Sequence, residues 1–267
     1  MVTTYRAAPD IDVITSDFAI PGFGLLPVNA FVLKGTEPIL VDTGAAVESD
    51  EFMTTLRSVI DPSDLKWIWL THTDFDHMGS LHRLLGEAPH LRLITTFAGV
   101  GIMSAYDPLP MDRVNFLNPG EKMTVGDRTL TAFKPPVYDN PSTTGFYDSK
   151  SKALFSSDCF GALVQRTVQN AGELSEQELR EGQVFWATVD SPWVHKVDRS
   201  ALGAELKTIQ QMEPDLVLSS HLAAASGSML GTLTAALAEA PGAQPFSAPD
   251  QAALEEMLKQ MTDAPPH

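Results

Sequence analysis

The stretch Thr71-His72-Thr73-Asp74-Phe75-Asp76-His77-Met78-Gly79 decides how this chain can fold and what it can bind. It follows a strongly apolar run at residues 65–70, which predicts a buried strand, and it precedes residues 80–85, where the apolar spacing predicts a helix. Buried strands of α/β sheets commonly end in functional residues. Four side chains that can bind a metal ion lie within six residues here: His72, Asp74, Asp76 and His77.

The spacing of these four residues favours two neighbouring metal ions over one. Side chains alternate along an extended segment, so His72 and Asp74 point to the same side. The turn that follows can direct Asp76 and His77 towards a second point nearby. Carboxylates buried side by side repel one another and lose hydration, and a bound cation removes both costs. We therefore predict that this stretch binds metal.

The overall composition is that of a globular protein, with 267 residues of which 43% are hydrophobic. The sequence has no internal repeat and no long polar linker, so we expect a single domain over residues 1–267, with a C-terminal helical extension from about residue 229. No apolar run approaches the roughly 18 residues that span a bilayer, and no signal peptide is visible at the N-terminus. The sole cysteine, Cys159, cannot form an internal disulfide, so we expect a cytoplasmic location.

The charge balance restricts the partners that this chain can bind. The formal net charge is -16. Nucleic acids and anionic membranes require a basic surface, so we expect neither as a partner. Small molecules and other proteins remain, and the sequence leaves a homodimer open.

Apolar runs that predict strands alternate with amphipathic runs that predict helices, which indicates an α/β fold. Helices are expected at residues 51–60 and 197–212, and a first short strand at residues 11–14. Three segments are irregular or undecided in the pattern: a loop or bent hairpin at 17–27, a loop at 107–119, and residues 184–189.

Histidine and aspartate recur after later predicted strands, at Asp42, Asp139, Asp158 and His221. Any one of these residues is uninformative, because an aspartate after a strand commonly caps a helix or forms a turn. Strand ends of an α/β protein can converge on one rim, however, so these residues can share a single site with the first stretch.

These motifs resemble the metallo-β-lactamase fold, whose usual motif is H-x-H-x-D-H. Here Asp74 occupies the second histidine position, giving H-x-D-x-D-H, which is similar to the flavodiiron and oxygen-binding diiron branch, where glutamate is usual. That branch has a histidine two residues before a proline, a tyrosine six residues after it, and an aspartate eleven residues later. The same spacing here gives Asp139, Pro141, Tyr147 and Asp158. Asp139 therefore falls at the position of the histidine that precedes the proline in that branch.

The resemblance extends over about residues 11–225, and it includes Ser219-Ser220-His221 as the segment of the last ligand. It implies an αββα sandwich in which two mixed sheets are flanked by helices. The flavodoxin-like domain that often follows in flavodiiron enzymes is not expected here, since the sequence ends at His267.

Carried over by position, the resemblance implies two metal positions bridged by Asp158. The first metal position comprises His72, Asp74 and Asp139, and the second metal position comprises Asp76, His77 and His221. Tyr138 is the alternative to Asp139, because an aspartate reaches less far than a histidine. Asp42 is expected to support the ligands from behind, and Asp76 and Asp158 are the candidate catalytic residues.

The charge of this ligand set bears on the metal and the reaction. Four carboxylates supply about -4 against about +4 from two divalent ions, so bound water is acidified less than in a cationic site. Oxygen-rich ligation favours iron, with zinc or manganese as alternatives.

We therefore expect a diiron protein that binds or reduces O2 with electrons from a separate donor protein. One alternative is a metal-dependent hydrolase that attacks an ester, lactone, thioester or phosphodiester substrate with a bridging hydroxide. A second alternative is a non-enzymatic sensor of O2 or metal.

Overall fold

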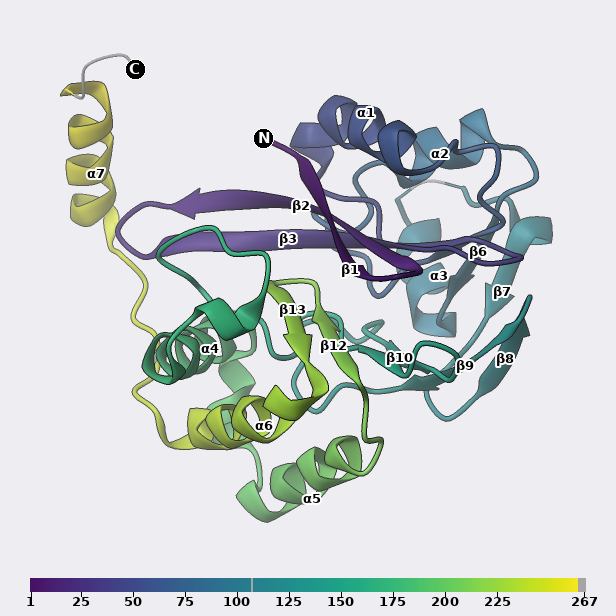
Figure 1. Ribbon diagram of the computed structural model, residues 1–267. Helices are drawn as coiled ribbons and strands as arrows, with labels where there is room; N and C mark the ends of the chain where they lie inside the picture. Colours follow the sequence, from purple (N-terminus) through teal and green to yellow (C-terminus); the bar gives the residue numbers. More distant parts are fainter. Residues whose placement is uncertain (107, 264–267) are drawn as a thin grey trace.

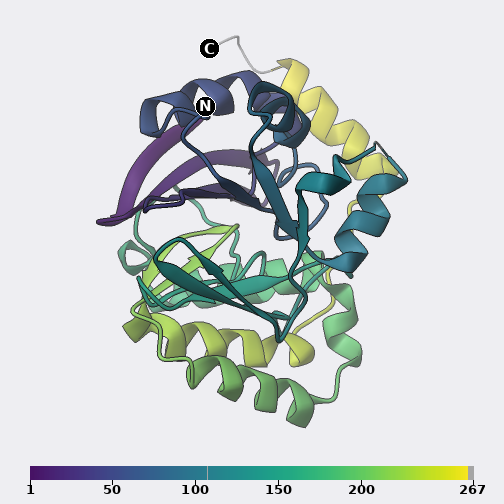
Figure 2. The same ribbon diagram turned by 90° about the vertical axis from the view of Figure 1, so that its right-hand side faces the viewer.

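The computed structural model describes residues 1–106 and 108–263. Two β-sheets lie face to face, and helices cover the outer face of each sheet (Figures 1 and 2). The predicted αββα sandwich is thus confirmed, and each of the two sheets mixes parallel and antiparallel strand pairs.

The first sheet has the strand order β1-β2-β3-β4-β5-β6-β7. Its strands β1 to β4 pair antiparallel, and β4 to β7 pair parallel. The bounds of its strands are β1 Thr3–Ala8, β2 Ile11–Ile20, β3 Gly24–Leu33, β4 Ile39–Val41, β5 Trp67–Trp69, β6 Arg92–Thr95 and β7 Val114–Phe116.

The second sheet has the order β13-β12-β11-β10-β9-β8, with one parallel pair between β11 and β12. The other neighbours pair antiparallel. The bounds of its strands are β8 Lys122–Val125, β9 Arg128–Phe133, β10 Gly145–Asp148, β11 Ala153–Phe155, β12 Leu216–Ser219 and β13 Leu222–Ser226.

Helices α1, α2 and α3 pack on the first sheet, and helices α4, α5 and α6 pack on the second (Figure 2). The C-terminal helix α7 follows an extended segment that runs past the β2–β3 hairpin (Figure 1). The helix bounds are α1 Ser49–Val59, α2 Leu81–Glu87, α3 Phe97–Ser104, α4 Glu176–Asp190, α5 Arg199–Gln210, α6 Leu230–Glu239 and α7 Gln251–Asp263. Short 3-10 helices occupy Ala46–Glu48, Met111–Arg113, Ala171–Glu173, Pro192–Lys196, Gly227–Met229 and Ala240–Gly242.

Aromatic side chains hold the two sheets together. Trp69 on β5 meets Phe146 on β10 with ring centroids 4.4 Å apart, and Phe146 stacks on Phe155 of β11 at 4.3 Å. Phe31 of β3 approaches the same Phe155 ring edge-on at 5.4 Å. These side chains are buried, and burial of such a ring stabilises the fold by roughly 1.5–3 kcal/mol each. The strand ends beside this layer are thereby fixed relative to one another.

Several local expectations need correction. The strand expected at residues 11–14 continues to Ile20, and residues 17–27 form the end of a long β2–β3 hairpin. The loop expected at residues 107–119 contains strand β7. Asp107 in this segment lies outside the described residues. The undecided segment 184–189 is helical and belongs to α4, whereas the helices expected at 51–60 and 197–212 are confirmed as α1 and α5.

Strands β1 and β13 were not expected from the sequence. Strand β1 is an edge strand that pairs with β2, so its sequence TTYRAA is only partly buried. Strand β13 reads LAAAS and is rich in alanine, which has a low propensity for strands. Within residues 1–106 and 108–263, no helix combines the length and the apolar character needed to cross a bilayer.

Candidate metal centre

The stretch 71–79 leaves the sheet directly after β5, whose side chains Trp67, Ile68 and Trp69 are buried. Asp42, at the end of β4, fixes the start of this stretch. Its carboxylate accepts hydrogen bonds from the Thr71 amide and from Thr71 Oγ1, both at 2.8 Å. The last residue of the stretch is Gly79. Only glycine fits at this position, because a Cβ there would lie 2.3 Å from the amide nitrogen of Ala46.

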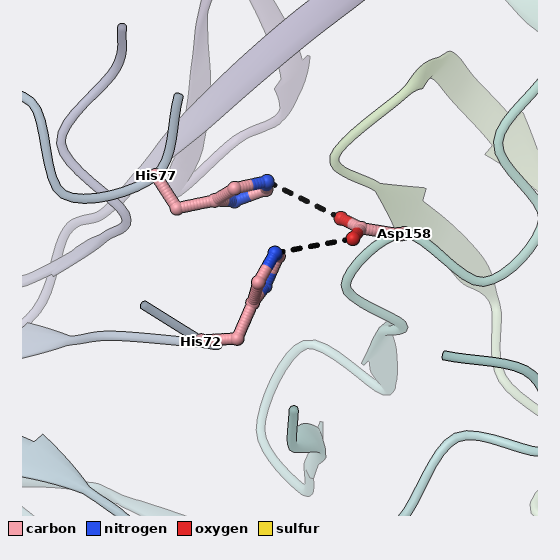
Figure 3. Close-up of side chains that lie close together, drawn as sticks. All are labelled: His72, His77 and Asp158. Atoms are coloured by element: carbon pink, nitrogen blue, oxygen red, sulfur yellow. Dashed lines mark ion pairs between the residues drawn. The ribbon is translucent and has the colours of Figure 1, made fainter. Parts of the chain in front are cut away.

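Asp158 lies at the centre of the site (Figure 3). It follows β11, and its side chain is 2% exposed. One carboxylate oxygen, Oδ2, lies 3.2 Å from His72 Nε2, and the other, Oδ1, lies 3.3 Å from His77 Nε2. His221 Nε2, after β12, also lies 3.3 Å from Oδ1. The two oxygens of one carboxylate therefore face two separate groups of side chains.

The second metal position is compact and rich in nitrogen. Asp76 Oδ2 lies 3.3 Å from His77 Nε2 and 3.6 Å from His221 Nε2. All the ligand atoms of this group lie within 4.8 Å of one another. Both histidines are buried.

The first metal position is richer in oxygen. Its carboxylates are partly exposed, as is Asp76 of the second metal position, whose side chain is 33% exposed. His72 Nε2 lies 3.9 Å from Asp74 Oδ2 and 3.9 Å from Asp139 Oδ1, and this group also fits within 4.8 Å. The Asp74 and Asp139 side chains are 43% and 21% exposed, whereas His72 is buried. Solvent therefore reaches the centre from this side.

Each of the three histidines is held through its Nδ1 atom, which leaves Nε2 for a metal. His221 Nδ1 donates to the Pro27 carbonyl at 2.7 Å, and His77 Nδ1 donates to Asp42 Oδ2 at 2.9 Å. His72 Nδ1 lies 3.1 Å from Thr71 Oγ1 and 3.2 Å from Ser157 Oγ. Asp42 thus occupies the supporting place that the resemblance implies.

The polar atoms that face the centre fit a pair of cations. Among the described residues, His77 Nε2 and Asp158 Oδ1 are buried and make no hydrogen bond, although they lie 3.3 Å apart. Buried polar atoms without partners are costly, and they are uncommon in folded proteins. Imidazole and carboxylate ligands bind iron, manganese and zinc, so metal ions between these groups would satisfy both atoms.

The ionisation of the second metal position reflects its close packing. Burial lowers the pKa of His221, but Asp158 and Asp76 outweigh this effect and raise it to about 9. Burial likewise opposes protonation of His77, yet its acidic neighbours, Asp76 first, hold the pKa well above the usual range. In contrast, burial dominates at His72 and lowers its pKa. Protons and metal ions therefore compete more strongly at the second metal position.

The carboxylates beside the first metal position behave differently. Burial raises the pKa of Asp139 to about 8, and repulsion from Asp158, Asp190 and Asp74 adds to this effect. Burial also raises the pKa of Asp190 to about 7, with Asp158 as the next cause. Carboxylates crowd together on this side of the centre, so Asp139 and Asp190 keep their protons to a higher pH than usual.

All seven predicted ligands come together in the structure: His72, Asp74, Asp76, His77, Asp139, Asp158 and His221. The alternative residue, Tyr138, packs elsewhere. Lys134 Nζ lies 3.8 Å from the centroid of its ring, and the Trp193 ring lies 5.2 Å away.

Two further residues lie at the site that were not predicted from the sequence. Asn140 Nδ2 donates to Asp74 Oδ1 at 2.9 Å and to Thr73 Oγ1 at 3.1 Å, so it orients a predicted ligand. Asp190 joins Asp139 and Asp158 in a third group of carboxylates. No sequence pattern indicated Asp190, because residues 184–189 before it were undecided and its approach to the site depends on the packing of α4.

The fold and this carboxylate–histidine centre define a protein of the metallo-β-lactamase-fold class. A family model described as "ODP family beta lactamase" matches residues 26–221. The chain belongs to this family.

Relatives with similar sequences include flavodiiron-type proteins. The chain is 26% identical over 167 residues to the anaerobic nitric oxide reductase flavorubredoxin of Citrobacter koseri, covering 62% of this chain and 35% of that protein. It is 24% identical over 177 residues to the rubredoxin-oxygen oxidoreductase of Megalodesulfovibrio gigas, covering 64% of this chain and 44% of that protein. The chain thus spans less than half the length of these relatives.

A solved structure shows the same fold. The rubredoxin oxygen:oxidoreductase from Desulfovibrio gigas superposes with a TM-score of 0.78 at 17% sequence identity. The superposition covers 91% of this chain and 63% of that chain.

Proposed function

We propose that this chain holds two iron ions and reduces a diatomic gas, with O2 as the substrate and electrons from a separate donor protein. The observation that carries the proposal is the division of the Asp158 carboxylate between His72 on one side and His77 and His221 on the other. A bridging carboxylate of this kind is suited to two metal ions that act together on one small molecule.

The donor set supports iron over zinc. The first metal position has carboxylate oxygens from Asp74, Asp139 and the shared Asp158. Such hard oxygen donors favour iron or manganese. Bound iron would supply the redox chemistry, in which O2 takes up four electrons and four protons and gives two waters. Two relatives are a rubredoxin-oxygen oxidoreductase and an anaerobic nitric oxide reductase flavorubredoxin, which supports a diatomic substrate.

The side chains of this chain would hold and shield the centre. His77 and His221 would bind through Nε2 while Asp42 and the Pro27 carbonyl keep their rings in place. The Trp186 ring packs edge-on against His221, with centroids 5.1 Å apart, and it would exclude water on that side. Small molecules would enter past the partly exposed Asp74 and Asp139.

The test begins with elemental analysis of protein produced without added metal. The expected result is two iron ions per chain. The protein is then reduced anaerobically and mixed with O2 or with NO, while gas consumption and absorbance are recorded. Turnover of O2 with a small one-electron donor supports the proposal. Faster turnover of NO than of O2 would show that NO is the substrate instead.

Two other results would overturn the proposal. Bound zinc together with turnover of model esters would instead support the hydrolase. Tight O2 binding without turnover would support the sensor.

A further inference from the structure

Helix α4 turns one face towards the metal centre. Trp186 and Asp190 lie four residues apart on this helix, so their side chains share a face. Trp186 contacts His221, as described above. Asp190 belongs to the group formed with Asp139 and Asp158, in which the carboxylate oxygens lie within 4.8 Å of one another.

The end of α4 is an unfavourable place for a carboxylate without a cation. Asp190 is the last residue of the helix, where the dipole disfavours negative charge, and the last turn contains no basic residue. Its Oδ2 accepts a hydrogen bond from Ser191 Oγ at 3.1 Å. A neutral hydroxyl does not compensate for three carboxylates that lie close together.

Two buried atoms of the same centre, on its His77 side, point to a bound cation. Asp158 is buried, and its Oδ1 makes no hydrogen bond within the described part of the chain. His77 Nε2, also buried, lacks a hydrogen bond and lies 3.3 Å from that oxygen. Asp190 therefore adds its carboxylate to a centre that already presents unsatisfied donor atoms.

We propose that Asp190 is an additional carboxylate ligand of the dinuclear centre, beside Asp139 and Asp158. This assignment rests on the dinuclear centre of the proposed function. The centre then contains three imidazoles, from His72, His77 and His221, and five carboxylates, from Asp74, Asp76, Asp139, Asp158 and Asp190. Five carboxylates around the whole centre supply about -5 against about +4 from two divalent ions.

This ligand set has a consequence for metal selection. Oxygen donors suit manganese and iron, whereas imidazole donors suit zinc as well. Asp190 should therefore raise the preference for Mn²⁺ over Zn²⁺ at the metal position that it joins, and leave the other position unchanged.

The test measures metal binding by the full chain and needs no activity. Wild type, Asp190→Asn and the control Glu181→Gln are dialysed against increasing Mn²⁺ or Zn²⁺, and bound metal is counted. Glu181 is an exposed residue of the same helix, so its variant removes one charge without touching the centre. Asparagine keeps the shape of Asp190 and removes its charge.

Asp190→Asn should weaken Mn²⁺ binding at one of the two positions by at least about 10-fold, with a smaller loss for Zn²⁺. Glu181→Gln should match the wild type. If the wild type binds two ions and Asp190→Asn binds them equally well, Asp190 is not a ligand, and the proposed function still stands. A wild type that binds fewer than two ions would overturn the proposed function as well.

A second measurement does not depend on any variant folding. In crystals of the wild type soaked with Mn²⁺, an Asp190 oxygen should lie within about 2.5 Å of one of the two ions, the range of metal–oxygen bonds. A distance beyond hydrogen-bonding range would overturn the assignment.

Discussion

The two metal positions are built in opposite ways. The second has two buried histidines whose rings are fixed by Asp42 and by a backbone carbonyl. The first has one histidine and two carboxylates that are partly exposed, and one of these carboxylates is oriented by the amide of Asn140. We infer that the second position holds its ion firmly, and that the first exchanges its ion more readily and faces the substrate.

Asp158 is the element that both positions share, so its loss should have the largest effect. Asp158→Ala should abolish binding at both positions, because each loses a buried carboxylate oxygen within 3.3 Å of its histidine. Metal analysis after dialysis checks this result. Glu205→Ala, which removes an exposed charge on α5, serves as the control and should retain both ions. Two ions in Asp158→Ala would show that this residue is not the bridge.

The pH dependence should separate the two positions next. A nitrogen that carries a proton cannot bind a metal, so affinity rises as the pH approaches a raised pKa from below. His77 and His221 both have raised pKa values, the latter about 9, so the second position should release two protons. Asp139, with a pKa of about 8, should release one at the first, where the pKa of His72 is lowered.

Between pH 7 and 8, above the pKa of Asp190 of about 7, the affinity should therefore rise more steeply with pH at the second position, by up to about 100-fold per pH unit, than at the first, where one proton gives about 10-fold. Calorimetric titrations at several pH values, in buffers of different ionisation enthalpy, count the protons. Equal slopes for the two ions would remove this distinction between the positions.

Removing the support behind one histidine should weaken only the second position. Asp42→Asn loses the charge that accepts the His77 Nδ1 proton, and such changes reduce metal affinity by about 10- to 100-fold. Binding isotherms for Mn²⁺ should show one weakened and one unchanged site. Equal weakening of both sites would mean that Asp42 acts on the fold as a whole, through its hydrogen bonds to Thr71.

Replacing an oxygen ligand with nitrogen should make the two positions more alike. Asp139→His should be tolerated, since this side chain is partly exposed, and it should raise the zinc affinity of the first position by about 10-fold. Competition between Zn²⁺ and Mn²⁺ measures the change. Asp139→Ala is the companion variant, and metal content identical to the wild type there would remove Asp139 from the ligand set.

Cys159 should have the smallest effect, although it follows Asp158, the proposed bridge. Its thiol is buried, and burial raises its pKa to about 12, so it should resist alkylation at pH 8 until the protein unfolds. Cys159→Ala should leave both metal positions unchanged, as judged by metal content. Loss of an ion would show that the thiol reaches the centre.

The same contrast explains what could be predicted from the sequence. The second position and His72 lie next to apolar strands in a dense motif, so local pattern and family resemblance both indicate them. Asp190 and Asn140 reach the site only through the packing of α4 and of the loop after β9, and no short-range pattern encodes such packing. The prolines and glycines in residues 21–27 left a loop and a bent hairpin both open, and the pairing of β2 with β3 shows that the segment is a hairpin.

X-ray diffraction at the iron absorption edge, from crystals of iron-loaded protein, tests the central claim most directly. Two iron ions about 3.5–4 Å apart, each bound to one oxygen of Asp158, are the result that this account predicts. A single ion, or two ions that do not share Asp158, would contradict it.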